Sequence, residues 1–125
     1  MLFFSDILGA EVRDQADQVV GRVFDAVIKL TESDYPSIVG VVVSGKRNVR
    51  QFVNAANIEN FGKNYLTLKN SFLEVAAEVP QDTGLIFLRG TVLDKQIVDL
   101  AGVRVVRVND LQFGIIKNAM CLVAL

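Results

Sequence analysis

The sequence predicts an all-β protein made of one small domain and part of a second copy of it. Valine is over-represented within an apolar fraction of 51%, and β-branched residues fit a pleated sheet better than a helix. The chain also repeats itself, because seven residues between positions 93 and 110 are identical to those found 85 positions earlier. A fixed period of this size indicates two copies of one small domain.

The identical residues keep the same spacing in both halves of the chain. They are Leu8, Asp14, Ala16, Val20, Arg22, Val23 and Asp25 in the first half, and Leu93, Asp99, Ala101, Val105, Arg107, Val108 and Asp110 in the second. We place the first domain at residues 1–80 and the second, truncated repeat at 85–125. The repeated part itself runs only from about Val92 to Leu125, 34 positions. A chain below about 40 residues rarely buries enough apolar surface to fold alone, so we expect the second repeat to pack against another surface.

The first copy is expected to contain five strands joined by short loops, which suits a small closed or nearly closed barrel. The strands are predicted at Glu11–Arg13, Val19–Leu30, Ile38–Val43, Val49–Val53 and Tyr65–Lys69. A single helical turn is expected before them, within Met1–Gly9, with Ser5 as its N-cap and Gly9 as its stop.

Turn residues separate these strands. Asp14–Asp17 suits a type I turn in which the Asp14 side chain binds local backbone amides and Asp17 takes the left-handed conformation. Imperfect alternation in Val19–Leu30, with Gly21 inside it, predicts a bulge or strong coiling near Arg22 in place of a flat strand. The other connections are expected to be a loop at Thr31–Ser37, a hairpin connection at Ser44–Asn48 and a turn at Asn60–Lys63.

The second half of the chain begins after one or two helical turns in Asn70–Pro80 and a linker at Gln81–Gly84. An apolar, β-like segment, Leu85–Leu88, leads into the second repeat. Its strands are predicted at Val103–Asn109, Gln112–Ile116 and Ala119–Leu125, with a turn at Lys117-Asn118 between the last two.

The last predicted strand, Ala119–Leu125, is apolar throughout and takes the place of Ile38–Val43 in the first copy. We expect an excerpt of a longer protein, or a half-barrel that is completed by another chain or by docking on the first copy. Because an open apolar edge invites pairing, homodimerisation through the second repeat is the predicted assembly.

The chemistry-bearing residues argue against catalysis. The chain has no histidine and a single cysteine, Cys121, within an apolar run, so a thiol nucleophile would lack its usual base. No phosphate-binding glycine pattern, zinc spacing or nucleophile elbow appears. The pairs Asp14 with Asp17 and Asp94 with Asp99 are of a residue type that binds metal ions. Asp14 and Asp99 each begin a predicted turn, however, and a turn-forming role suits them better. We therefore predict no enzyme, cofactor or metal.

The candidate interaction residues are basic. Lys46, Arg47 and Arg50 form the one basic cluster, which could touch phosphate, although a solvated turn is the simpler interpretation. Arg22 and Arg107 each precede an aspartate by three positions, and on a regular strand such residues face opposite sides. We expect these two arginines to cover the barrel mouth or to pair with a carboxylate elsewhere.

Charge and hydropathy restrict the partners. The 13 basic and 14 acidic residues nearly cancel, so no overall field recruits nucleic acid or anionic lipid. No segment approaches the roughly 18 uninterrupted apolar residues of a membrane helix, and the N-terminus lacks the basic region of a signal peptide. A lone cysteine fits a reducing compartment. We expect a soluble, cytoplasmic protein without direct membrane insertion.

Two segments carry a family resemblance. VVGRVFDAVIKL after a turn, and LDKQIVDLAGVRVVRVND, resemble the PRC-barrel family, small β-barrels named after the photosynthetic reaction-centre H subunit. The second segment is similar to bacterial proteins in which paired PRC-barrel units precede a magnesium-transporter-type N-terminal domain and CBS domains. Asn54-Ala55-Ala56 stands where the family often has a Pro-Trp pair.

The resemblance implies a small PRC-type barrel that acts without catalysis. Family members hold a ribosomal protein in the ribosome maturation factor, cap the reaction centre on its cytoplasmic side, and are presumed regulatory in the transporter-like group. The leading hypothesis is a cytoplasmic protein-interaction or regulatory module whose partner is another protein or further domains of the same chain. The alternatives are an RNA- or ribosome-associated assembly module that uses the Lys46–Arg50 hairpin, and a sensor of a small ligand or metal ion in the barrel mouth.

Overall fold

The computed structural model describes residues 2–30, 35–91, 98–100, 103–105, 111–117 and 119–124. Strands dominate this part of the chain, and each α-helix is a single turn of four residues. The predicted all-β class, with at most short helical turns, is therefore confirmed.

The elements have the following bounds. They are β1 (Leu2–Phe3), α1 (Phe4–Ile7), β2 (Glu11–Arg13), β3 (Val19–Lys29), β4 (Ser37–Ser44), η1 (Lys46–Asn48), β5 (Arg50–Asn54), η2 (Ala55–Asn57), β6 (Ile58–Phe61), β7 (Tyr65–Leu68), α2 (Phe72–Val75), β8 (Ala76–Ala77), β9 (Leu85–Phe87), α3 (Leu88–Thr91), β10 (Val98–Leu100), β11 (Val103–Val105), β12 (Gln112–Ile116) and β13 (Ala119–Ala124), where η marks a 3-10 helix.

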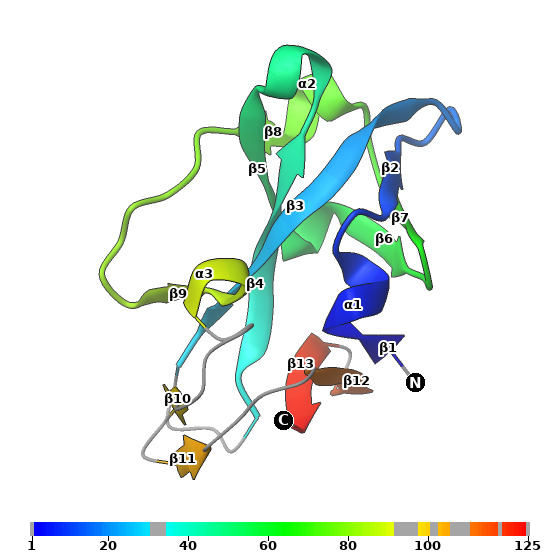
Figure 1. Cartoon of the computed structure of the whole chain (residues 1–125). Coiled ribbons are helices and arrows are strands. Elements are labelled where there is room, and N and C mark those ends of the chain that lie inside the picture. Colours follow the sequence, from blue (N-terminus) through cyan, green and yellow to red (C-terminus); the bar gives the residue numbers. More distant parts are fainter. Residues whose placement is uncertain are drawn as a thin grey trace.

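Nearly all of the described strands belong to one curled, half-barrel sheet (Figure 1). Its main path runs β1-β12-β13-β4-β3-β2-β7-β6, while β5 adds to β4, β8 to β5 and β9 to β3. A separate two-stranded ribbon is formed by β10 and β11. The sheet therefore combines strands from both halves of the sequence.

Strand β3 is the spine of this sheet. It pairs with β4 along one edge, while its other edge pairs first with β2 and then with β9. The register between β3 and β4 shifts between Val23 and Asp25, so the predicted bulge lies next to Arg22. A bulge increases the local twist and bend, which suits a strand that crosses a curled sheet.

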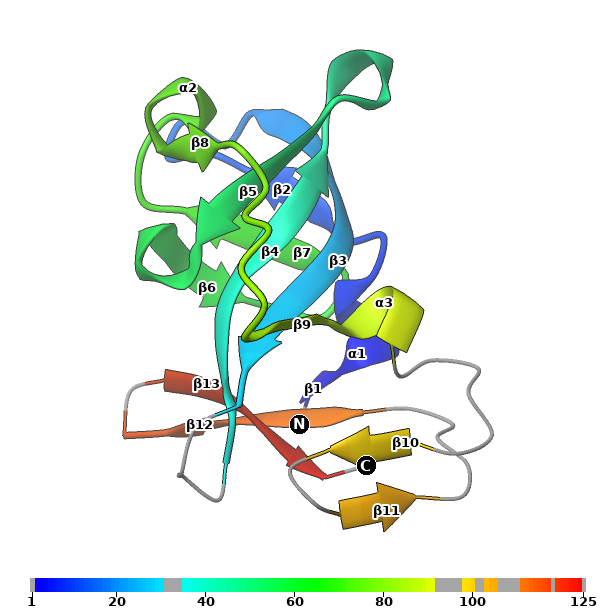
Figure 2. The same cartoon turned by 90° about the vertical axis from the view of Figure 1, so that its left-hand side faces the viewer.

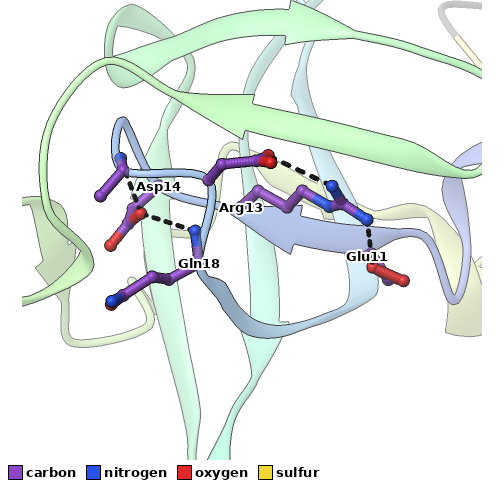
Figure 3. Close-up of polar contacts among 6 residues, drawn as sticks. Glu11, Arg13, Asp14 and Gln18 are labelled. Atoms are coloured by element: carbon purple, nitrogen blue, oxygen red, sulfur yellow. Dashed lines mark hydrogen bonds and ion pairs between the residues drawn. The ribbon is translucent and has the colours of Figure 1, made fainter.

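The turn between β2 and β3 forms as predicted (Figure 3). The Asp14 Oδ1 atom accepts hydrogen bonds from the backbone N–H groups of Ala16 at 2.9 Å and Gln18 at 3.0 Å. Asp17 has a φ of 62°, in the left-handed region that aspartate tolerates better than most residues. Asp14 therefore has the structural role that the sequence indicates.

Corresponding strands of the two copies pair in the same antiparallel way, β2 with β3 and β10 with β11. Val98 pairs with Val105, and the positions that correspond to them 85 residues earlier are Arg13 and Val20. Arg13 pairs with Val19 instead, because the first copy has a register shift between Val12 and Arg13. Likewise β12 pairs with β13 in an antiparallel hairpin, as β3 pairs with β4.

The hairpin β12–β13 docks on the first copy below α1 (Figure 1). Its first strand pairs with β1, and its second strand meets β4, where Cys121 lies opposite Ser37. Phe113 is 1% exposed and packs edge to face on Phe4, with ring centroids 6.3 Å apart. Of the three expectations for the second repeat, docking on the first copy describes this hairpin.

Two apolar clusters form the core. The larger lies inside the curled sheet and includes Phe4 and Phe113. The smaller consists of Val27, Val42 and Phe52, against which residues of the segment 79–87 pack. Figure 2 shows this segment crossing the outer face of the sheet before it enters β9. Val79, Leu85 and Phe87, which lie on either side of the predicted linker Gln81–Gly84, therefore cover a second, smaller core, while the linker residues themselves are exposed.

Two local predictions were wrong. Ser5 is not an N-cap, because α1 begins at Phe4 and the Asp6 carboxylate accepts the backbone N–H of Phe3 at 3.0 Å instead. The predicted turn at Asn60–Lys63 begins with two residues of β6. This strand was missed because the register shift between Ile58 and Asn60 interrupts its alternation. Of the predicted loop Thr31–Ser37, residues 31–34 lie outside the described part, and Ser37 already belongs to β4.

Candidate functional site

An open groove of about 420 Å³ lies at the seam between the two halves of the sheet. Strands and a 3-10 helix of the first copy form one side of it, and the hairpin β12–β13 forms the other. It is lined by Ile38, Ala55, Ala56, Ile58, Glu59, Asn60, Phe61, Lys69, Ile115, Ala119 and Met120. Eight of these eleven side chains are apolar, and polar atoms make up about half of the exposed surface of the groove.

The groove forms because two strands follow one another along the same edge of β4. Strand β13 meets this edge at Ser37, and β5 begins to pair with it at Gly40. Ile38 lies between these two points and is 4% exposed, while Ile58 in β6 is 6% exposed. These two buried isoleucines form the floor of the groove.

Two free strand edges border the groove. Within the described ranges, β6 pairs only with β7, and β13 pairs only with β12 and, through Cys121, with β4. All four residues of β6 line the groove, as do Ala119 and Met120 at the start of β13. A free edge presents unpaired backbone N–H and C=O groups to an incoming strand.

The rim of the groove is partly polar. Glu59, Asn60 and Lys69 supply one acid, one amide and one ammonium group. Ile115, which pairs with Met120 across the β12–β13 hairpin, is 73% exposed and extends the apolar surface outward. The site therefore offers backbone hydrogen bonds, an apolar floor and a sparse set of charges.

The predicted basic cluster lies elsewhere, on the hairpin between β4 and β5. Arg47 and Asn48 both have positive φ angles, 59° and 58°, and the Val49 N–H donates to the Lys46 carbonyl at 3.2 Å. Two successive left-handed residues closed by this bond make a type I′ turn. Lys46, Arg47 and Arg50 are all exposed.

Arg22 and Asp25 do not meet. The Arg22 guanidinium donates from Nη1 to the Gly9 carbonyl at 2.9 Å. The Asp25 Oδ1 atom accepts the backbone N–H groups of Ala26 and Arg89, both at 2.8 Å. Burial raises the pKa of the Asp25 carboxyl, and these two backbone hydrogen bonds oppose the shift. The equivalent pair of the second copy, Arg107 and Asp110, lies outside the described residues.

Arg89 joins the basic residues although the sequence did not single it out. Its guanidinium carbon lies 4.3 Å from the centroid of the Phe24 ring, and that of Arg50 lies 3.6 Å from the same centroid. The pairing of β9 with β3 brings Arg89 to this place from 65 positions away. No local sequence signal could have revealed that contact.

The acidic residues near the β2–β3 turn are engaged with Arg13. Its Nη2 atom lies 3.1 Å from Glu11 Oε1, and its Nη1 atom lies 3.2 Å from Asp17 Oδ1 (Figure 3). The hydrogen bond to Glu11 and, to a smaller extent, the one to Asp17 raise the pKa of the Arg13 guanidinium. In the described part of the chain, no three acidic, histidine or cysteine residues are grouped so that they could hold a metal ion. Cys121 is buried, as its apolar run indicated.

A scan against protein-family models and a search of curated proteins both find no match to the chain. Among the described residues, no helix has both the length and the apolar character needed to cross a membrane.

Proposed function

We propose that this protein is a non-catalytic interaction module that binds an extended strand of a partner protein in the seam groove. The proposal includes what the PRC-barrel resemblance implies. We propose a cytoplasmic, regulatory role within a larger bacterial protein related to magnesium-transporter regulatory regions.

The observation that carries this proposal is the pair of free edges, β6 and the start of β13, that border one groove lined mostly by apolar side chains. In strand addition, main-chain hydrogen bonds supply affinity and pockets for alternate side chains supply specificity. Successive side chains of a strand point to opposite faces. A partner with apolar residues at every second position would place them on Ile38 and Ile58 and keep its other side chains in water.

The partner could also be a second copy of this chain, which is how we now understand the predicted homodimer. The second repeat contributes Ile115, Ala119 and Met120 to the groove, so such a dimer would use the repeat that we expected to mediate assembly. Light scattering over a concentration series measures the solution mass and separates self-association from binding of another protein.

The RNA-associated alternative has less support. It would use the Lys46–Arg50 hairpin, but the only aromatic ring shown to contact a cation there, that of Phe24, is covered by two guanidinium groups in the described structure. Single-stranded nucleic acid usually requires free aromatic faces for base stacking. The sensor alternative predicts thermal stabilisation by one specific metal ion or small molecule, because a ligand that binds only the folded state raises its stability.

A peptide display library tests the groove directly. We would select random linear peptides that bind the complete chain and sequence them. We expect alternating apolar residues in the selected peptides. Ala56 lines the groove and is exposed, so Ala56→Gln should narrow the groove without burying a polar group, and should weaken peptide binding about tenfold or more.

The matched control is Ala16→Gln, because Ala16 is also exposed but lies in the turn between β2 and β3. This variant should bind the selected peptides as the native chain does. The proposal fails if Ala56→Gln leaves binding unchanged, or if backbone amide signals of β6 do not shift when a selected peptide is added to the isotope-labelled chain.

A further inference from the structure

Five exposed cations gather on a surface distant from the groove residues. Arg22 lies on β3, Lys46 and Arg47 on the hairpin turn, Arg50 on β5 and Arg89 on α3. Arg22 and Arg50 both pair with Ser44, one on each side. Residues directly opposite one another in a sheet point to the same face, so these two arginines share the outer face of β3–β5. We call the five residues the basic face.

Two members of the basic face are held in position by one ring. The guanidinium carbons of Arg50 and Arg89 lie 3.6 and 4.3 Å from the centroid of Phe24. Arg89 is fixed further, because its Nη1 donates to the Phe24 carbonyl at 3.1 Å and its backbone N–H donates to buried Asp25. Stacking leaves the in-plane N–H donors of a guanidinium group free for an anion.

Among the described residues, both ion pairs belong to Arg13, so no described carboxylate forms an ion pair within 4.0 Å with any of the five cations. The buried Asp25 carboxylate accepts the Arg89 backbone N–H and attracts the Arg89 charge from a greater distance. Like charges held near one another repel, and an external anion removes this cost. Arg47 also occupies the left-handed region at φ 59°, and such strain in a residue other than glycine is found preferentially at functional sites.

We propose that the basic face binds an acidic polypeptide segment, at a site separate from the groove. Guanidinium groups match carboxylates in bidentate geometry, and charge complementarity favours a segment with several Asp or Glu residues. Nucleic acid is a poorer match. The chain has a net charge of −1, so it lacks the long-range field that draws a polyanion, and the Phe24 ring is already covered by cations.

Fluorescence anisotropy with a labelled Glu-rich peptide, measured on the complete chain at low salt, tests this site. The double variant Arg50→Gln with Arg89→Gln should bind at least about tenfold more weakly, because charge-assisted hydrogen bonds are lost. The control double variant, Lys63→Gln with Lys117→Gln, removes the same charge at two exposed residues outside both the basic face and the groove, and should bind as the native chain does. Circular dichroism confirms that each variant is folded.

Two further variants keep the result unambiguous. Arg47→Gly suits the left-handed turn and should therefore fold, yet it should weaken peptide binding because it removes one cation. Ala56→Gln, which narrows the groove, should bind the Glu-rich peptide normally, so failure of the groove and failure of the basic face are distinguishable. Equal losses in the arginine and lysine double variants would overturn the proposal. So would tighter, more salt-sensitive binding of a single-stranded RNA oligonucleotide at the same arginines.

Discussion

Phe113→Ala is expected to destabilise the groove and the first copy together, because Phe113 joins the second repeat to the core. The ring is 1% exposed and meets Phe4, which is fully buried, edge to face. Its strand, β12, pairs with β1, and the Phe4 N–H donates to the Leu111 carbonyl at 2.8 Å. The contact between the two halves is therefore both apolar and hydrogen-bonded.

The magnitude follows from burial. Truncation of a fully buried Phe to Ala costs about 3–5 kcal/mol, which includes the cavity that remains. Loss of the aromatic pair accounts for about 0.5–1.5 kcal/mol of such costs. A domain of this size has a free energy of unfolding of about 5–15 kcal/mol. We therefore expect Phe113→Ala to remove about a fifth or more of the free energy of unfolding of the protein.

Urea denaturation followed by far-ultraviolet circular dichroism measures this change. Ile115→Ala is the matched control, because Ile115 lies two residues further along β12 and is 73% exposed. A surface substitution of this kind changes stability by about 0.5 kcal/mol or less. A single transition shifted strongly by Phe113→Ala alone is the expected result. A loss below about 1 kcal/mol, or a separate transition for the hairpin, would refute the view that the two halves share one core.

Two further predictions concern the outer face of β3–β5. Burial raises the pKa of Asp25, so the fold favours its protonated form. The stability that Asp25 contributes is then fully present below its ordinary pKa and is lost as the pH rises through the raised value. Asp25→Asn keeps an oxygen for the amides of Ala26 and Arg89, and its stability relative to the native chain should rise over that pH range. Urea denaturation at several pH values measures this difference. The same pH dependence of the free energy of unfolding in both proteins would contradict the prediction. Arg47→Gly should stabilise the fold by about 0.5–1 kcal/mol, because a side chain costs energy in the left-handed region. Asn48→Gly should gain less stability than Arg47→Gly, since asparagine tolerates the left-handed region. Thermal denaturation measures both gains, and a gain for Asn48→Gly that equals or exceeds that for Arg47→Gly would contradict this.

Features encoded within a few residues were predicted well from the sequence. The Asp14 turn, β2 and β7 were found because turn residues and short apolar or alternating runs define them locally. β6 was missed because its bulge hides the alternation, and the Ser5 cap was wrong because α1 already begins at Phe4. Local patterns do not show where a register shift falls or at which residue so short a helix begins.

The seam groove and Arg89 escaped prediction for a different reason. The groove is built from residues 38–69 and 115–120, and Arg89 reaches Phe24 through the pairing of β9 with β3. These contacts depend on where β13 and β9 add to the sheet, and repetition in the sequence states only that similar hairpins exist. A docked second repeat and a dimerised one are compatible with the same sequence pattern.

The two proposed surfaces use strands that pair with the same edge of β4 at different residues. Strand β5, which carries Arg50, pairs with this edge from Gly40 onward, whereas β13, which forms a wall of the groove, meets it at Ser37. A substitution at the start of β13 that leaves the shared core untouched should therefore impair the groove and leave the basic face intact. Ala119 is exposed and lines the groove, so Ala119→Gln should weaken binding of the display-selected peptides and keep binding of the Glu-rich peptide. Simultaneous loss of both would mean that the two surfaces are not independent.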